Sequence, residues 1–288
     1  MKELVVIRGK GGTGKTTVLA SFAALAGGSV LADCDVDAPD LYLLLHPQVD
    51  HQEEFRAGYM AAIDPAVCTA CGRCREVCRF DAISADLQVV EADCEGCGAC
   101  EVVCPVGAVE LLERVAGDWY RGLTPYGPMV YARLRPAEEN SGKLVALVRR
   151  EAKAAAEQTG RQMVLTDGPP GIGCPVIAAV GGADLALLVT EPTPSGSHDV
   201  ARAVQLCAHF QVPAMVCVNK RDLNPALAGQ IEAHCEQAGV PATPGIPFDE
   251  AVPQAIRQGV PLVEHSAGPA ACAVKAVWEQ VRARLLGG

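Results

Sequence analysis

Residues 3–17, Glu-Leu-Val-Val-Ile-Arg-Gly-Lys-Gly-Gly-Thr-Gly-Lys-Thr-Thr, join a short apolar run to a glycine-rich loop. The run over residues 3–8 predicts a buried strand, and a helix is expected over residues 15–26. The loop fits the spacing G-x4-G-K-[ST], in which glycines let backbone N–H groups approach phosphates and the helix N-terminus adds a favourable dipole. The stretch therefore predicts a phosphate-binding loop between a strand and a helix.

The chemistry of phosphate binding gives the residues of this loop their expected roles. Lys15 should reach the β- and γ-phosphates of a nucleotide, and the hydroxyl of Thr16 should bind Mg²⁺. The other predicted nucleotide-binding residues of the loop are Gly9, Gly11, Gly12, Thr13, Gly14 and Thr17. A chance glycine-rich turn is the alternative, and the flanking strand and helix argue against it.

A second pattern lies between residues 68 and 104, where the spacing C-x2-C-x2-C-x3-C occurs twice. In two-cluster bacterial ferredoxins the fourth cysteine of each run binds the other cluster. We therefore assign one 4Fe-4S cluster to Cys68, Cys71, Cys74 and Cys104, and a second to Cys78, Cys94, Cys97 and Cys100. Zinc sites and disulfides are the alternatives, but zinc normally uses separated C-x2-C pairs, and disulfides need an oxidising compartment.

Residues 60–112 resemble the bacterial ferredoxin module in the number and spacing of the cysteines. Arg79 follows Cys78 where the motif usually has proline, whereas Pro105 follows Cys104 as the motif expects. The arginine should change the local turn and the local field rather than the ligands.

With Lys10 inside it, the glycine-rich loop resembles the deviant Walker A loop of the MinD/ParA/Mrp superfamily. The resemblance implies ATP as the nucleotide, a homodimer with ATP at the interface, and an ATPase that is slow without a partner. It also implies that Lys10 contacts the nucleotide of the other subunit and stabilises charge in trans. A solvated loop lysine is the other reading of Lys10.

Alternating strands and helices predict an α/β fold, a mostly parallel sheet with helices on both faces and ligands at the carboxyl ends of the strands. We expect further strands at 29–32, 119–121, 128–134, 162–166, 184–190, 213–218 and 243–246, and helices at 141–159, 196–210, 225–238, 249–258 and 270–286. The cysteine runs interrupt this pattern. The predicted domains are residues 1–55 and 116–288 for the nucleotide-binding part, with an inserted α+β ferredoxin-like domain at 56–115.

Acidic residues follow predicted strands of the nucleotide-binding part. Asp167 ends an apolar strand and is predicted to hold Mg²⁺. The family resemblance implies that Asp35 positions the attacking water, that Asp33 lies near the metal, and that Gly171 senses the γ-phosphate. The alternative is that these acids only cap loops at strand ends.

Base recognition is expected from Asn219, Pro247 and Asp249, at positions that resemble the base-binding loops of the superfamily. Residues 219–222, Asn-Lys-Arg-Asp, also match the guanine-reading pattern Asn-Lys-x-Asp. ATP is favoured by the resemblance, and GTP stays open.

The charge composition indicates which kinds of molecule the protein is expected to bind. The formal net charge is −10, and residues 64–112 hold nine acidic and three basic residues. An acidic insert favours a basic redox partner and argues against nucleic acid. There is no signal peptide or long apolar span, so a cytoplasmic protein without membrane association is expected. The segment 274–286 is predicted to be a packed last helix, with a membrane-binding helix as the alternative.

Three functions remain open. The first is nucleotide-gated electron transfer to an unknown redox partner, and the second is an Mrp-type carrier that passes a cluster to an apo-protein acceptor. The carrier reading needs a bridging cluster at Cys174, which is otherwise a small buried cysteine at a helix start. The third is a MinD-like positioning protein with structural clusters. The other isolated cysteines, Cys34, Cys207, Cys217, Cys235 and Cys272, are interpreted as core residues.

Overall fold

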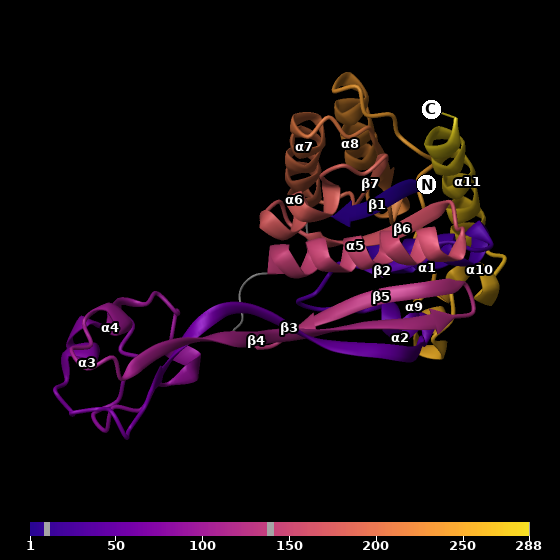
Figure 1. The fold of residues 1–288 in the computed structure, drawn as a ribbon. Helices are drawn as coiled ribbons and strands as arrows, with labels where there is room; N and C mark the ends of the chain where they lie inside the picture. Colours follow the sequence, from indigo (N-terminus) through magenta and orange to yellow (C-terminus); the bar gives the residue numbers. More distant parts are fainter. Residues whose placement is uncertain (9–11, 137–140, 288) are drawn as a thin grey trace. The chain divides into compact units, whose positions relative to one another are not determined.

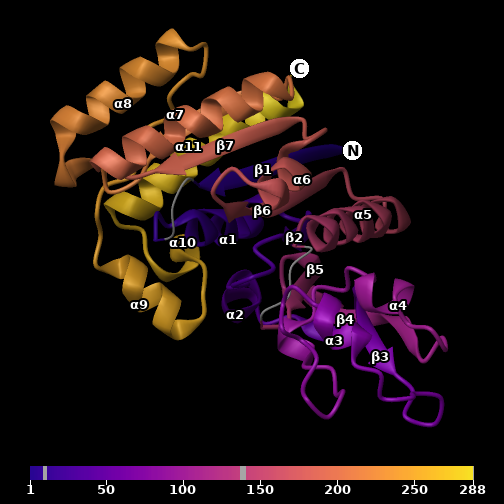
Figure 2. The same cartoon turned by 90° about the vertical axis from the view of Figure 1, so that its left-hand side faces the viewer.

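The structure is a computed structural model that describes residues 1–8, 12–136 and 141–287. The chain divides into two compact units (Figures 1 and 2). Unit 1 comprises Met1–Glu53, Trp119–Arg133 and Ser141–Gly288, and unit 2 comprises Glu54–Asp118 and Leu134–Asn140. The predicted insert, at residues 56–115, falls within the first segment of unit 2.

An eight-stranded sheet runs through the fold in the order β3-β4-β5-β2-β6-β1-β7-β8. Its strands are β1 (Lys2–Arg8), β2 (Val30–Asp33), β3 (Gln48–Ile63), β4 (Val109–Thr124), β5 (Gly127–Leu134), β6 (Met163–Pro170), β7 (Leu185–Thr190) and β8 (Ala214–Val218). Neighbouring strands from β5 through β2, β6, β1 and β7 to β8 are parallel. The predicted mostly parallel α/β sheet is therefore confirmed.

Helices cover both faces of the parallel part of the sheet (Figure 1). Helices α1 (Lys15–Ala26) and α11 (Pro269–Leu286) pack on one face, with α2 (Leu41–Leu45), α9 (Ala251–Gln258) and α10 (Leu262–His265) nearby. Helices α5 (Ser141–Thr159), α6 (Cys174–Val180) and α7 (Pro194–His209) cover the other, and α8 (Pro225–Gln237) contacts α7 and β8. Parallel strands buried on both faces explain the apolar runs seen in the sequence.

Helix α11 is part of the core, as predicted from its pattern. Val274, Val277, Trp278 and Val281 are buried, and the ring of Trp278 lies 5.0 Å from that of Phe22 on α1. Within the described residues, no helix combines the length and the apolar character that crossing a membrane requires.

Several elements differ from the sequence prediction. Strand β3 was not predicted, because the first half of Gln48–Ile63 is mostly polar and the strand alternates irregularly between exposed and buried positions. Strand β4 is much longer than the predicted 119–121. Helices α2 and α10 are short segments that the pattern did not reveal, whereas α6 begins at Cys174, where a helix start was expected. Residues 243–246 form no strand, and Ile246 contributes only an isolated bridge to Asn219.

A buried ion-pair network connects β1 to helices α5 and α6. Glu3 accepts hydrogen bonds from Arg149 Nε at 2.8 Å and from Arg149 Nη2 at 2.6 Å, and Lys153 lies 2.9 Å away. Arg149 Nη1 also donates to the carbonyl oxygens of Ala178 and Gly181, at the carboxyl end of α6. Burial alone would raise the pKa of Glu3, but the two cations outweigh it and lower that pKa. The network therefore holds β1, α5 and α6 together.

Unit 2 is small and built around its cysteines. It contains two short helices, α3 (Arg73–Val77) and α4 (Ala99–Val102), and an antiparallel bridge between Ile83 and Val89. Among its described residues, one cluster of buried apolar side chains forms, made of Ala61, Cys74, Ile83, Cys100 and Val109. A core of this size supplies little hydrophobic stabilisation on its own.

Candidate functional site

The strand ends of unit 1 bring the predicted acids together. In the parallel register, Asp33 at the end of β2 pairs with Asp167 on β6, and Asp167 also pairs with Val6 on β1. Helix α1 begins at Lys15, directly after the glycine-rich loop that follows β1. The carboxyl edge of the sheet therefore carries the acids and the loop side by side.

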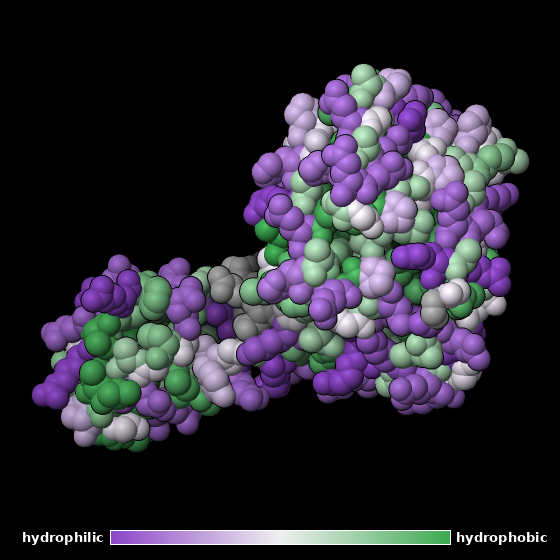
Figure 3. Space-filling view, turned by 90° about the horizontal axis from the view of Figure 1, so that it is seen from above, coloured by the Kyte–Doolittle hydropathy of each residue, from purple (hydrophilic) through white to green (hydrophobic). Residues whose placement is uncertain are grey.

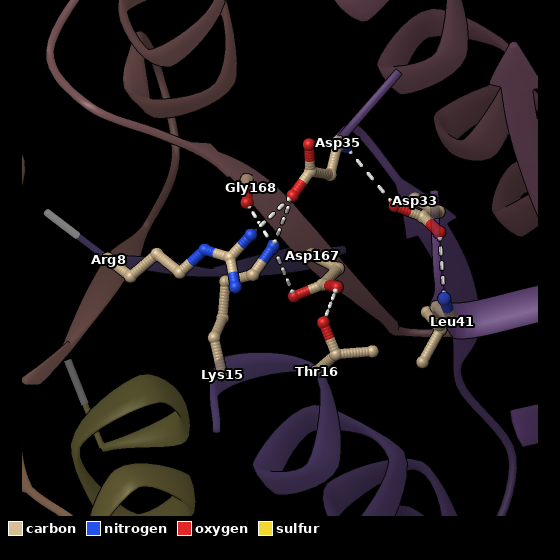
Figure 4. A network of polar contacts seen from close by, with 8 residues as sticks. All are labelled: Arg8, Lys15, Thr16, Asp33, Asp35, Leu41, Asp167 and Gly168. Carbon is tan, nitrogen blue, oxygen red and sulfur yellow. Dashed lines mark hydrogen bonds and ion pairs between the residues drawn. The ribbon is translucent and has the colours of Figure 1, made fainter. Parts of the chain in front are cut away.

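Lys15 lies at the centre of this cluster (Figure 4). Its ammonium group is fully buried and donates to the carbonyl oxygen of Gly168. It forms ion pairs with Asp167 Oδ1 at 3.0 Å and with Asp35 Oδ2 at 3.6 Å. The contact with Asp167 lacks hydrogen-bond geometry, so Asp167 Oδ1 has no hydrogen-bond partner although it is buried.

Thr16 and Asp167 form the pair expected to hold Mg²⁺. The hydroxyl of Thr16 donates to Asp167 Oδ2 at 2.8 Å (Figure 4). Burial raises the pKa of Asp167 even though Lys15 opposes the shift. A buried carboxylate that lacks one hydrogen bond is a suitable oxygen ligand for a divalent cation.

Asp33 makes backbone contacts instead of facing Lys15. Its two carboxylate oxygens accept hydrogen bonds from the N–H groups of Asp35 and Leu41, both at 3.1 Å. Burial, and next the charge of Asp167, raise the pKa of Asp33 well above its usual value. Asp33 thus shapes the loop between β2 and α2, and Asp35 is the acid of that loop that forms an ion pair with Lys15.

Arg8 is a site residue that sequence reasoning missed. Its Nη2 donates to Asp35 Oδ2 at 2.9 Å, so Asp35 lies between two cations, Arg8 and Lys15 (Figure 4). The N–H of Gly171 donates to the carbonyl oxygen of Arg8 at 3.2 Å, and Gly171 has a φ of 87°. A charged residue ending an otherwise apolar strand, just before the loop, was the available signal.

The described part of the glycine-rich loop is shaped for a close approach of backbone and ligand. Gly12 and Gly14 have φ values of 88° and 84°, in the left-handed region that favours glycine. The side-chain amide of Asn219 donates to the carbonyl oxygen of Thr13 at 2.8 Å, so a side chain on Gly14 would collide with it. The hydroxyl of Thr13 is buried without a hydrogen-bond partner. Gly9, Lys10 and Gly11 lie outside the described residues.

A pocket of about 270 Å³ adjoins this loop and is lined by Gly12, Gly14, Thr17, Asn219, Pro247 and Asp249. Apolar side chains from α9, α10 and α11 complete its wall, among them Val252, Leu262 and Val274. The structure therefore brings the three predicted base-binding residues together beside the phosphate loop. An apolar pocket with a few polar groups suits a flat aromatic base.

Two acids of this region accept hydrogen bonds from backbone N–H groups. Asp222 Oδ1 accepts a hydrogen bond from the N–H of Phe248 at 2.7 Å. Asp249 accepts from the N–H groups of Ala251 at 2.9 Å and Ala270 at 3.3 Å. Lys220 pairs with Glu191 at 2.7 Å. The contact of Asp222 with Phe248 holds the loop at 246–249 against the segment that follows β8.

Unit 2 contains two hollows, each lined by four cysteines. The first hollow is lined by Cys68, Cys71, Cys74 and Cys104, and the second hollow by Cys78, Cys94, Cys97 and Cys100. In each hollow, three cysteines come from one run and the fourth comes from the other run. In the described part of the chain, no three His, Cys, Asp or Glu side chains lie close enough to hold one metal ion.

The two cysteine runs form similar local structures. Gly72 and Gly98, with φ values of 79° and 77°, precede the short helices α3 and α4 that carry Cys74 and Cys100. Burial raises the pKa of both thiols. By contrast, backbone N–H groups, that of Val106 first, lower the pKa of Cys104. A side chain on Gly96 would collide with the carbonyl of Tyr59, so only glycine fits there.

The surface of unit 2 carries apolar residues close to the hollows. Exposed apolar side chains include Val67, Phe80, Val102 and Val106, and Figure 3 shows hydrophobic surface on this unit at the left. Phe80 lines the second hollow and Val106 lines the first. Both hollows are therefore bordered by apolar groups that a partner could contact.

The isolated cysteines divide into two groups. Cys34, Cys207, Cys217 and Cys235 are buried, which confirms their interpretation as core residues. Cys174 and Cys272 are exposed, so the core readings of these two were wrong. Cys174 begins α6 immediately after the loop that contains Gly171, and the first turn of a short helix lies at the surface. Cys272 lies on a face of α11 that points away from the core.

Comparisons with known proteins agree with this geometry. Residues 4–262 match the family described as the CobQ/CobB/MinD/ParA nucleotide binding domain. An uncharacterized protein of Methanocaldococcus jannaschii, MJ0578, is 36% identical over 227 residues, covering 77% of this chain and 79% of that protein. A second uncharacterized protein of the same organism, MJ0579, is 26% identical over 239 residues, covering 80% and 85%.

Among solved structures, the cell division ATPase MinD of Pyrococcus furiosus has a TM-score of 0.59 at 18% identity, and the alignment covers 98% of each chain. MinD of Pyrococcus horikoshii, complexed with Mg-ADP, also has a TM-score of 0.59 at 18% identity, with 97% and 95% covered. At this identity the structural likeness concerns the fold. From the match over residues 4–262 and the sheet and loop described above, the chain belongs to the CobQ/CobB/MinD/ParA family of nucleotide-binding domains.

Proposed function

We propose that this protein is a dimeric ATPase that couples nucleotide-driven movement to electron transfer through two 4Fe-4S clusters in unit 2. The observation that carries the proposal is the pair of four-cysteine hollows in unit 2 of a chain that also holds a phosphate-binding loop. The three-plus-one sharing of cysteines between runs is the ligand pattern of two-cluster bacterial ferredoxins.

The cysteines fit two clusters better than single ions. A single zinc ion needs ligands that converge on one point, and no such group exists among the described residues. In a 4Fe-4S cluster each thiolate binds a different iron, so the four sulfurs surround a larger volume. When bound, the clusters would supply one-electron transfer. The chain's own contribution is to place the thiolates and the backbone N–H groups around them.

The nucleotide site supports ATP and Mg²⁺. Thr16 and Asp167 would hold Mg²⁺, Lys15 would bind the β- and γ-phosphates, and Asp35 would position the attacking water. Solved MinD complexed with Mg-ADP shares this fold. Lys15 would have to leave Asp167 and the carbonyl of Gly168 to reach a phosphate, so nucleotide binding would rearrange this edge of the sheet.

Two contacts would respond to the γ-phosphate. Gly171 donates its N–H to the carbonyl of Arg8, and a γ-phosphate would compete with that carbonyl for the same group. Asp35 is held by Arg8 and Lys15, and loss of Lys15 to the phosphate would free it to accept from water. Lys10, which would contact the partner's nucleotide across the dimer, is proposed from the family resemblance alone.

ATP is favoured over GTP by the contact of Asp222. The aspartate of the Asn-Lys-x-Asp pattern reads guanine only if its carboxylate faces the base. Here it accepts from the N–H of Phe248 and so holds the base-binding loop. The pattern in residues 219–222 is therefore explained by loop structure.

The test is an anaerobic reconstitution of the full chain, followed by iron and sulfide analysis and a redox titration monitored by EPR. The titration is run without nucleotide, with Mg-ADP and with Mg-ATP. About eight irons per chain and a midpoint potential that changes with nucleotide are expected. If both clusters form but their midpoint potentials and the rate at which they reduce a partner are the same with and without nucleotide, the proposed coupling is wrong.

A second candidate is a cluster carrier, and the exposure of Cys174 favours it. Cys174 lies at the surface directly after the Gly171 loop, where a second subunit could supply a matching thiol. This reading predicts iron above that of the eight cysteines, and Cys174→Ala should remove the excess. Cys272→Ala is the matched control, because Cys272 is also exposed but lies on α11. Equal iron content in all three proteins would exclude the carrier.

A MinD-like positioning role is less well supported. The membrane-binding alternative for residues 274–286 requires a free amphipathic helix, whereas α11 buries Trp278 and its apolar neighbours in the core.

A further inference from the structure

We propose that the two cysteine hollows hold their clusters at different reduction potentials, with the first hollow at the higher potential. The inference rests on the proposed iron–sulfur function and adds which of the two clusters has the higher reduction potential. Potentials of such clusters depend on net charge, on hydrogen bonds to the sulfurs and on solvent exposure. Each of these can be compared between the two hollows, because both use the same set of ligands.

Exposure does not distinguish the two hollows. In each, the second cysteine of the run is exposed, the third is buried, and the first is intermediate, as is the cysteine contributed by the other run. The exposed pair is Cys71 and Cys97, and the buried pair is Cys74 and Cys100. Any difference in potential must therefore come from charge or from hydrogen bonds.

The charged side chains that line the hollows favour a higher reduction potential at the first hollow. Arg73 lines the first hollow, whereas Glu95 lines the second. A positive charge beside a cluster stabilises the reduced form, and a negative charge destabilises it. The two residues are not at corresponding positions in the two runs. Arg73 directly precedes the third cysteine of its run, where the other run has Ala99. Glu95 directly follows the first cysteine of its run, where the other run has Thr69.

The neighbouring charges in the sequence add to this difference. The charged residues within three positions of the ligands of the first hollow are Arg73, Arg75, Glu76 and Glu101. Those within three positions of the ligands of the second are Arg75, Glu76, Arg79, Asp81, Glu91, Asp93, Glu95 and Glu101. Arg114 also lies beside the second hollow, where it donates to the carbonyl oxygen of Cys94 at 3.2 Å. Acids outnumber cations at the second hollow even with Arg114 counted, whereas acids and cations are equal in number at the first.

Hydrogen bonds to sulfur point in the same direction. Two backbone N–H groups donate hydrogen bonds to sulfurs of the first hollow. Ala70 donates to Cys68 Sγ at 3.4 Å, and Ala108 donates to Cys104 Sγ at 3.1 Å. Such bonds stabilise the extra negative charge of the reduced state. In a chain that carries one electron, the electron would therefore be found mainly on the cluster in the first hollow. The cluster in the second hollow, when reduced, would transfer its electron to the first.

The experiment is an EPR-monitored redox titration of the reconstituted full chain without nucleotide, using dithionite as reductant. We expect two one-electron signals. Arg73→Gln should lower only the higher midpoint potential, and Glu95→Gln should raise only the lower one. Each change should alter the reduced-to-oxidised ratio about threefold at fixed potential, which is about 28 mV for a one-electron couple. Both side chains are exposed, so neither substitution should unfold the unit.

Arg56→Gln is the matched control, because Arg56 carries the same charge in unit 2, pairs with Glu54 and lines neither hollow. It should leave both potentials unchanged. A shift of the lower signal by Arg73→Gln, or no selective shift by either variant, would overturn the proposed order while leaving the clusters in place. Absence of iron after reconstitution would overturn the proposed function, and the order with it.

Discussion

At the scale of single residues, Asp222 provides a test of the loop at 246–249, which we propose to bind the base. Its carboxylate accepts from the N–H of Phe248, which lines the base pocket beside Asp249. Asp222→Ala should remove about 1 kcal/mol from nucleotide binding and weaken ATP affinity about fivefold, because the loop loses a charge-assisted hydrogen bond. The measurement is isothermal titration calorimetry with Mg-ATP and Mg-GTP.

The preference for ATP over GTP should be the same in this variant as in the parent, because Asp222 does not face the base. Asp222→Asn keeps an acceptor for Phe248 and serves as the control, with affinity close to that of the parent. A selective loss of GTP binding in Asp222→Ala would instead show that the pattern in residues 219–222 reads guanine.

The cysteines provide a second test at this scale. Burial raises the pKa of Cys207 and Cys235 to about 11 and that of Cys217 to about 12, so these thiols are inert at pH 8. Iodoacetamide should therefore modify Cys174 and Cys272 in the cluster-loaded protein. Peptide mass spectrometry reads the sites, and cysteines of the two runs should become reactive only after iron is removed. Labelling of the runs before iron removal would contradict cluster ligation.

At the scale of elements, the buried contact between Glu3 and Arg149 holds β1 to α5 and α6. Glu3→Gln should lower the free energy of unfolding by about 3 kcal/mol at pH 7, because it leaves Arg149 without its charge partner in the core. Urea unfolding measures the change. Glu151→Gln, which breaks the more exposed pair with Arg150, should cost no more than about 0.5 kcal/mol.

The pH dependence of this variant follows from the lowered pKa of Glu3. A lowered pKa means that the ion pair contributes stability above the ordinary value of 4.5, and that this contribution disappears as pH falls through the folded-state pKa. The difference in stability between parent and Glu3→Gln should therefore shrink below about pH 4.5. If the difference in unfolding free energy between the parent and Glu3→Gln is the same below pH 4.5 as at pH 7, the loss of stability comes from packing and not from the ion pair.

Elements also differ in how far the sequence could predict them. The strand and helix around the glycine-rich loop were predictable, because apolar periodicity and the loop spacing agree there. Helix α1 lies at its predicted bounds, Lys15–Ala26. Strand β3 could not be predicted, since its pairing with β4, and not its own pattern, makes it a strand. The helix start at Cys174 was expected, but the exposure of its side chain depends on how the first turn of α6 packs, which no local pattern reveals.

The candidate site was predictable in its residues but not in its contacts. Spacing and strand ends pointed to Lys15, Thr16 and Asp167, which the structure places in one network. The pairing of Arg8 with Asp35 depends on the distance between β1 and the loop after β2, and the sequence contains no information on that distance. The same holds for Asp33, whose carboxylate is used by backbone N–H groups.

At the scale of the whole molecule, the two units should differ in what stabilises them. The buried apolar cluster of unit 2 has five residues, two of which are cysteines, whereas that of unit 1 spans the sheet and its helices. A small domain without a large core depends on bound metal for its stability. Removal of iron by a chelator should therefore unfold unit 2 while unit 1 stays folded.

Calorimetry and tryptophan fluorescence can separate the two units. The chain has two tryptophans, Trp119 and Trp278, so Trp119→Phe leaves Trp278 as a reporter of the unit 1 core beside Phe22. Chelation should abolish one thermal transition and leave the Trp278 transition unchanged. Mg-ATP at 100 times its dissociation constant contributes about 2.7 kcal/mol and should raise the Trp278 transition by about 5–10 °C. If a single thermal transition responds to both iron and nucleotide, the two units unfold together. The nucleotide site and the clusters would then be coupled through the stability of the whole chain as well as through movement.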